Sequence, residues 1–117
     1  MRILTFPAIG LLATPALAQD TMVEVQDRAA LPGFEINADV ADDLDVLAAA
    51  GVKIGEVEEV VGPDRDTPEA LVVDFEDEAA TYGAEDRVVP LTAFLFDGSA
   101  MQLNEGTDVT GLPIWND

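Results

Sequence analysis

The sequence predicts an all-β fold, a small antiparallel barrel with a short C-terminal helical turn, preceded by a cleaved signal peptide. From Val40 onward, short apolar runs alternate with turn signals, a pattern that favours strands over helices. About five or six such runs are joined by roughly 2–7 residues, and none of the connections reads as a helical crossover. Because parallel neighbours need such crossovers, we expect an antiparallel sheet rolled into a barrel.

The first two runs carry one ambiguity and one irregularity. Leu44–Ala50 fits either a helix capped by Asp42–Asp43 or a strand that enters a hairpin at Gly51. Val52–Val61 reads as a strand whose apolar phase changes after Gly55. A β-bulge explains this change, because one extra residue resets the two-residue period of a strand.

The central runs are more regular. Gly62–Pro68 is a polar turn in which Asp side chains can accept hydrogen bonds from nearby backbone N–H groups. Ala70–Phe75 is the clearest strand, and an acidic loop, Glu76–Glu85, follows it. Arg87–Leu91 is the next strand, and its Pro90 cannot donate to a ladder, so it belongs at an edge or a strand end.

The last part of the chain predicts a hairpin and a cap. Asp97–Gly98 is a strong hairpin signal, and it separates the runs Ala93–Phe96 and Ala100–Asn104. Thr107–Thr110 is expected to form one helical turn before the closing segment Leu112–Trp115.

Residues 1–18 have the features of a secretory signal peptide. Arg2 is their one charged residue, an apolar stretch follows it, and the segment ends in Ala16–Ala18. The apolar stretch is shorter than the ~20 residues that a membrane span needs. We therefore expect cleavage after Ala18 and a periplasmic protein that begins at Gln19. Cleavage removes one Arg and no acid, so the formal charge of −19 becomes −20.

Residues 19–39 show neither a helical nor a strand period, and Pro32–Gly33 interrupts them. We interpret them as a flexible leader that lays Phe34 or Ile36 on the surface of the domain. A partner-docking arm is the alternative. The barrel domain itself is then residues 40–117.

Six segments of this domain follow one another in an order that resembles the PRC-barrel family. No single segment is specific, but the order of all six is. They are Lys53–Glu59 (KIGEVEE), Gly62–Asp64 (GPD), Glu69–Asp74 (EALVVD), Val89–Leu91 (VPL), Phe96–Gly98 (FDG) and Leu112–Trp115 (LPIW).

The resemblance implies a small β-barrel without catalysis of its own whose general role is to dock on partners. The family includes domains similar to those of photosynthetic reaction-centre H subunits and of a ribosome-maturation factor, together with short stand-alone bacterial proteins. This chain departs from the stand-alone members in its loop Glu76–Glu85, which is acidic where theirs is rich in Gly and apolar residues. A fold shared with other proteins does not transfer their function.

The composition argues against an enzyme. The chain has no Cys and no His, so thiolate nucleophiles, zinc fingers and the commonest general base are all excluded. Ser99 has no His to activate it and reads as a turn residue. We predict no catalytic residues and no cofactor. With 5 Lys and Arg against 24 Asp and Glu, nucleic acid is also excluded as a partner.

Acidic clusters raise the question of a metal site. Oxygen ligands suit Ca²⁺, but no segment has the order of an EF-hand loop. Composition alone explains several clusters, so we predict no specific metal site. The best candidate ligands among them are Asp64, Asp66 and Glu69.

The sequence therefore predicts an exported adaptor that binds a protein or another component of the envelope. Trp115 and Tyr82 are the candidate contact residues, since aromatic side chains are enriched at binding hot spots. The alternative is an acidic periplasmic protein that binds divalent cations with low affinity. A third interpretation takes the acidity as adaptation to a saline habitat.

Overall fold

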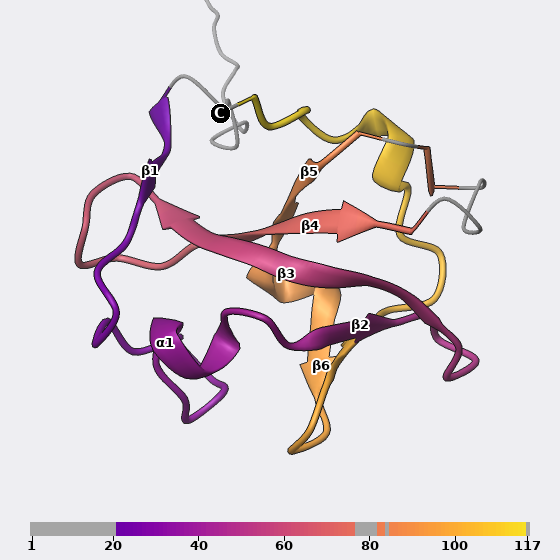
Figure 1. Cartoon of the computed structure of the whole chain (residues 1–117), viewed down its shortest axis with the longest axis horizontal. Coiled ribbons are helices and arrows are strands. Elements are labelled where there is room, and N and C mark those ends of the chain that lie inside the picture. The colour runs from indigo at the N-terminus through magenta and orange to yellow at the C-terminus, as the bar shows by residue number, and fades with distance from the viewer. Residues whose placement is uncertain (1–20, 77–81, 84, 117) are drawn as a thin grey trace, which may run out of the picture.

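The computed structural model describes residues 21–76, 82–83 and 85–116 (Figure 1). The predicted signal peptide, residues 1–18, and residues 77–81 and 84 of the acidic loop lie outside the described residues. Within the described part, the fold is one seven-stranded sheet with little helix. The strands and the helix are β1 (Val23–Glu24), α1 (Ala38–Ala41), β2 (Asp45–Leu47), β3 (Lys53–Gly62), β4 (Ala70–Phe75), β5 (Arg87–Pro90), β6 (Phe94–Phe96) and β7 (Met101–Leu103).

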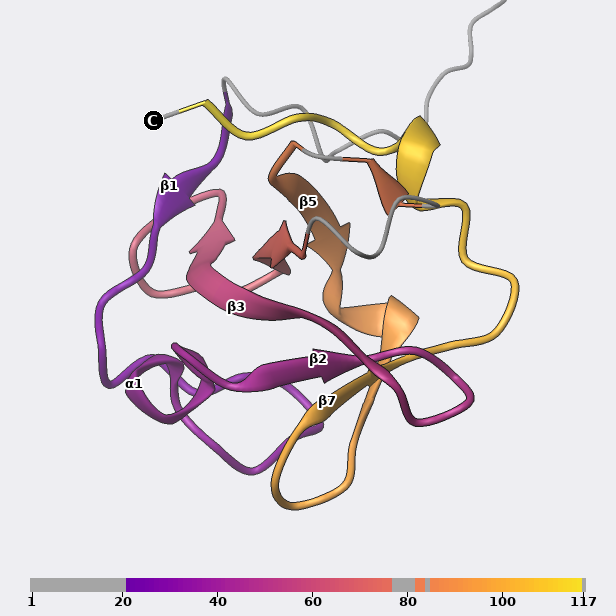
Figure 2. The same ribbon diagram turned by 45° about the vertical axis from the view of Figure 1, so that its right-hand side comes forward.

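The sheet is curled into a half-barrel, and it is mixed rather than purely antiparallel. Its strand order is β5-β4-β3-β2-β7-β6, and β1 pairs with β3 outside this path. β2 runs parallel to β7, with Val46 opposite Met101 (Figure 2). The expectation of an antiparallel sheet is wrong at this one pair. These two strands are far apart in the sequence, and the chain between them contains four other strands, β3 to β6, instead of a helical crossover.

The ambiguous run after Asp43 is a strand. It forms β2, and the turn that follows it closes through the N–H of Gly51, which donates to the carbonyl of Ala48 at 2.8 Å. Gly51 has a φ of +95°, which L side chains rarely adopt. The predicted bulge is also present, because the register of β2 against β3 shifts beside Gly55. A second shift, against β4, lies between Val57 and Glu59.

β4 lies between β3 and β5, and its residues Ala70–Val73 are buried on both faces. Leu71, Val73 and Phe75 point into the main core, while Ala70 and Val72 belong to a smaller cluster on the other side. Burial on both faces explains why Ala70–Val73 are continuously apolar rather than alternating, whereas Asp74 is exposed on the outer face. The main core also receives side chains from β2, β3, β6 and β7.

The segment that precedes the expected domain packs on it. Leu31, only 2% exposed, lies in the main core, and Met22 lies in the smaller cluster. Asn37 caps the single turn of α1, since its side chain accepts a hydrogen bond from the N–H of Val40 at 2.9 Å. The buried core of the domain therefore draws on residues from 22 onward, well before residue 40.

The C-terminal segment crosses back to β5. The predicted helical turn near Thr107–Thr110 is present as a 3₁₀ turn, Val109–Gly111. Arg87 holds the segment, because its Nη1 donates to the carbonyls of Leu112 at 2.8 Å and Thr110 at 3.2 Å. Among the described residues, no helix is long and apolar enough to cross a membrane.

Candidate functional site

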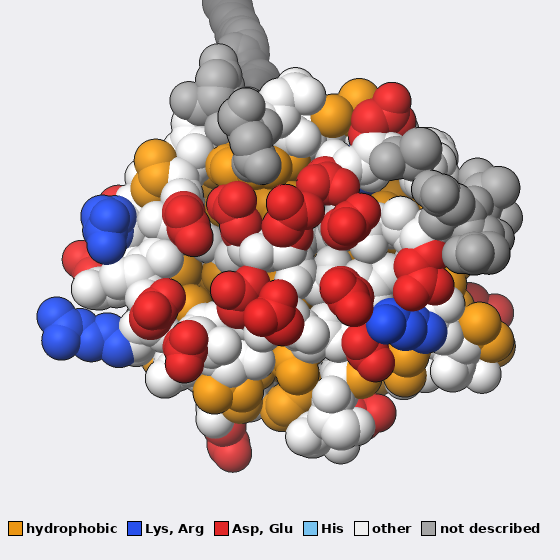
Figure 3. Space-filling view, viewed as in Figure 1, with side chains coloured by type: hydrophobic (Ala, Val, Ile, Leu, Met, Phe, Trp, Pro, Cys, Tyr) orange, Lys and Arg blue, Asp and Glu red, His pale blue; other side chains and the backbone are white. Residues whose placement is uncertain are grey.

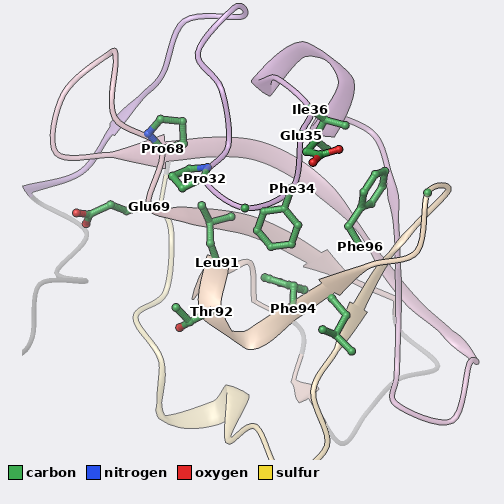
Figure 4. A pocket seen from close by; sticks show the side chains of 13 residues that line it. Pro32, Phe34, Glu35, Ile36, Pro68, Glu69, Leu91, Thr92, Phe94 and Phe96 are labelled. Carbon is green, nitrogen blue, oxygen red and sulfur yellow. The ribbon is translucent and has the colours of Figure 1, made fainter.

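The described residues form an open groove of about 850 Å³ (Figure 4). Three segments that are far apart in the sequence line it. They are the loop Pro32–Ile36, the pair Pro68–Glu69 before β4, and the segment from Leu91 to Gly98 that contains β6. Most of the lining is apolar, and its charged members among the described residues are Glu35 and Glu69.

The loop on one side of the groove is held in a fixed shape by its own backbone. The N–H of Leu31 donates to the carbonyl of Ile36 at 2.9 Å, and the N–H of Phe34 donates to the carbonyl of Leu31 at 3.2 Å. Gly33 and Glu35 both have positive φ angles, which let the loop turn tightly. As a result, the ring of Phe34 stands in the middle of the groove, half-buried against the core (Figure 4).

The other side of the groove is β6 and its hairpin. Phe94 is buried, whereas the side chain of Leu95 is 61% exposed. The turn is fixed by Asp97, whose Oδ1 accepts hydrogen bonds from the N–H groups of Ser99 and Ala100, both at 2.8 Å. These bonds lower the pKa of Asp97. The predicted Asp97–Gly98 hairpin is therefore confirmed, and it places an exposed leucine at the rim of the groove.

A row of carboxylates runs across the outer face of the sheet (Figure 3). Asp45 on β2 lies opposite Glu56 on β3, and Glu56 lies opposite Asp74 on β4. Lys53 partly balances this row, with its Nζ 3.2 Å from Asp45, 3.3 Å from Glu56 and 3.6 Å from Glu76. Hydrogen bonds to Asp45 and Glu56 raise the pKa of Lys53.

Three carboxylates meet at the end of this row. One oxygen from each of Glu58, Asp74 and Asp86 lies within 4.8 Å of the others. Carboxylate oxygens are ligands that Ca²⁺ prefers, and these three could supply part of the roughly 6–8 oxygens that the ion takes. Glu58 is the extra residue of the second register shift in β3. The sequence pattern alone did not connect it with Asp86.

The metal-ligand candidates taken from the sequence have local roles in the structure. The Oδ1 of Asp64 accepts from the N–H of Asp66 at 2.9 Å and from the hydroxyl of Thr67 at 2.8 Å. These bonds lower the pKa of Asp64. Asp66 accepts a hydrogen bond from the side chain of Gln26, while Glu69 lies at the rim of the groove.

The aromatic candidates pack on their own chain. The ring of Tyr82 stacks on Phe75 with centroids 5.3 Å apart and an interplanar angle of 7°. Trp115 packs on the smaller core cluster, and its backbone N–H donates to the carbonyl of Asp86 at 2.9 Å. Ser99 is a turn residue, and its hydroxyl donates to Asp97 at 3.0 Å.

Reasoning from the sequence missed the groove. One signal was available, since Phe94, Leu95 and Phe96 are three consecutive apolar residues in a strand, and alternation forces the middle one outward. The contribution of the loop Pro32–Ile36 had no such signal. Comparisons of this chain with protein-family models and with curated protein sequences give no match.

Proposed function

We propose that this chain is an exported PRC-barrel-like module that binds another protein in the bacterial periplasm and has no catalytic activity. The observation that carries this proposal is the apolar groove, with Leu95 exposed at its rim. An apolar surface of this kind gains free energy when a partner covers it, since burial removes it from water. The curled β-sheet, the order of the six motif segments and the signal-peptide features of residues 1–18 support the same proposal.

In-cell photo-crosslinking tests this function at a single position. A photoreactive phenylalanine analogue replaces Leu95 in the groove, and a matched control carries it at Val52, which is 65% exposed but does not line the groove. We expect a discrete periplasmic protein adduct from position 95 and none of the same mass from position 52. Identical adducts from both positions, or none from either, contradict the proposal. Sequencing the N-terminus of the exported chain checks for cleavage before Gln19.

The alternative function is low-affinity binding of divalent cations. The approach of Glu58, Asp74 and Asp86 to within 4.8 Å favours it. A bound Ca²⁺ would offset the repulsion among these carboxylates. Calorimetric titration with Ca²⁺ tests it: saturable heat that is lost in Asp74→Asn and kept in Asp108→Asn supports this function. The absence of saturable heat at physiological ionic strength rejects it.

A further inference from the structure

The two ends of the sheet differ in how their outer edges are covered. At the β5 end, the N–H of Val88 donates to the carbonyl of Pro113 at 2.9 Å. The backbone of Arg87 also forms an isolated antiparallel β-bridge with that of Ile114. Pro90 has no N–H to offer. The outer edge of β5 is therefore closed by the C-terminal segment and by a proline.

The outer edge of β6 is open. The N–H of Asn104 donates to the carbonyl of Ala93, and the N–H of Asp97 donates to that of Ala100. Along an antiparallel pair of strands, hydrogen-bonded and non-hydrogen-bonded residue pairs alternate. Because the pairs on either side of the strand are hydrogen-bonded at Ala93 and Asp97, Leu95 also forms its backbone hydrogen bonds with Gln102. Phe96 stands opposite Met101 as a non-hydrogen-bonded pair, so its N–H and carbonyl face away from β7, and β6 is the last strand of the sheet that the described residues form.

This open edge lies along the apolar groove. Phe94, Leu95 and Phe96 all line the groove, and Phe34 and Leu91 face them from its other parts (Figure 4). An extended chain added beside β6 would place alternate side chains toward Phe34 and Leu91. The intervening side chains would lie next to Leu95 on the outer surface.

The charges around the groove indicate which kind of peptide would bind beside β6. Glu69 and Glu35 lie at different ends of it (Figure 4). Among the described residues that line it there is no Lys or Arg. The whole chain carries a formal charge of −19, so the potential around this surface favours cations. A second copy of the chain would bring an equal negative charge and is disfavoured.

We propose that β6 takes up an extended segment of another protein as an additional strand. This segment has apolar residues at alternate positions and Lys or Arg near Glu35 and Glu69. Backbone hydrogen bonds to Phe96 supply affinity, and the groove and its two acids supply selectivity. The inference rests on the proposed protein-binding function and specifies its ligand.

A labelled peptide in which Val alternates with Lys tests the proposal by fluorescence anisotropy, with the full chain at about 150 mM salt. Three probes serve as comparisons. They are the same composition with its Val residues in one block, an alternating Val–Glu peptide, and the Val–Lys peptide N-methylated at every second residue. We expect each to bind at least about tenfold more weakly, as the loss of one or two hydrogen bonds or of charge attraction predicts. Equal binding of the N-methylated peptide overturns strand addition.

Two pairs of variants locate the site. The double variant Glu35→Gln, Glu69→Gln should weaken binding several-fold, whereas Glu24→Gln, Glu105→Gln removes the same charge elsewhere and should not. Equal losses mean that the peptide follows the general charge of the chain, and the inference is then wrong. Phe96→Pro removes the outward N–H without touching the bonds that Leu95 makes with Gln102. It should weaken binding about tenfold, and the N-methylated peptide gives the same information if this variant does not fold.

Other occupants of the groove give different outcomes. A dimer seen by sedimentation that the peptide dissociates would assign the groove to a second copy. Such a dimer overturns the inference. Binding by a chain that begins at Gln19, but not by the full chain, would show that residues 1–18 cover the groove until they are cleaved, and it supports the inference for the exported chain. A crosslinked partner at position 95 that persists in Phe96→Pro rejects strand addition while the proposed function stands. Peptide binding without any crosslinked partner rejects the function but leaves the open edge as a binding site.

Discussion

Glu56 on β3 lies directly opposite Asp74 on β4, so two carboxylates face each other across an antiparallel pair. Like charges that stand directly opposite each other destabilise a sheet. Asp45 lies opposite Glu56 on the other side, and Glu58 and Asp86 approach Asp74. The carboxylates on the outer face of the sheet therefore repel one another. This repulsion lowers the stability of the fold, and burial of the apolar core offsets it.

Salt should stabilise this protein by screening that repulsion. The screening length falls from about 30 Å at 0.01 M to about 3 Å at 1 M salt. We expect the Tm to rise steadily with NaCl in this range, and calorimetry measures it. Asp74→Asn should raise the Tm at low salt and flatten the response, while Glu105→Gln, on an exposed turn, should change it less. If the Tm of the wild-type chain does not change with NaCl, repulsion among these carboxylates does not limit its stability. The interpretation of the acidity as adaptation to salt would then be wrong as well.

Gly62 should not tolerate a side chain. A Cβ at this position would collide with the carbonyl oxygen of Thr67 in the following turn, which is backbone and cannot move aside. We expect Gly62→Ala to lower the free energy of unfolding by about 1–3 kcal/mol or more, measured by urea denaturation. Gly111→Ala is the matched control, since its nearest neighbour would be the Asp108 side chain at 3.2 Å. Equal costs for the two variants would contradict the predicted collision.

Arg87 should be required to hold the C-terminal segment in place. Its Nη1 donates to two backbone carbonyls, and hydrogen bonds from charged donors contribute about 1.5–3 kcal/mol. We expect Arg87→Met to speed amide hydrogen exchange in residues 109–116 more than in β3. An unchanged exchange rate in that segment would show that other contacts hold it.

Asp42 should give an unusual pH dependence. Desolvation by burial raises its pKa from 3.8, and the nearby charges of Asp43, Glu24, Asp27 and Asp39 raise it further. An acid whose folded pKa is raised destabilises the native state above that pKa, and the penalty disappears as the pH falls toward 3.8. We therefore expect Asp42→Asn to raise the Tm at pH 7, with a gain that shrinks on acidification. A gain that does not depend on pH would point to packing instead.

Asp97 should behave in the opposite way. Bonds to Ser99 and Ala100 lower its pKa, so its contribution to stability is present above 3.8 and is lost as the pH falls through the lower folded value. Asp97→Ala should therefore lower the Tm at pH 7 and lower it less in acid. The reverse trend would mean that the hairpin does not depend on this carboxylate.

The sequence by itself determined the local elements. Ala70–Phe75 is a strand over the expected residues, and the bend at Asp97–Gly98 forms the expected hairpin. These features depend on side-chain period and turn chemistry, which neighbouring residues specify. The same local rules did not distinguish a helix from a strand for Leu44–Ala50. In the structure, pairing with β3 makes part of this segment a strand.

Only the tertiary structure decided which distant residues meet. The parallel pairing of β2 with β7, the packing of Leu31 in the core, and the groove between Phe34 and β6 each join segments that are separated along the chain. No local period encodes such contacts, because they follow from how the curled sheet buries its apolar faces. The sequence therefore established a small acidic β protein, and the fold decided that one sheet edge closes at Pro90 while the other stays open at Phe96.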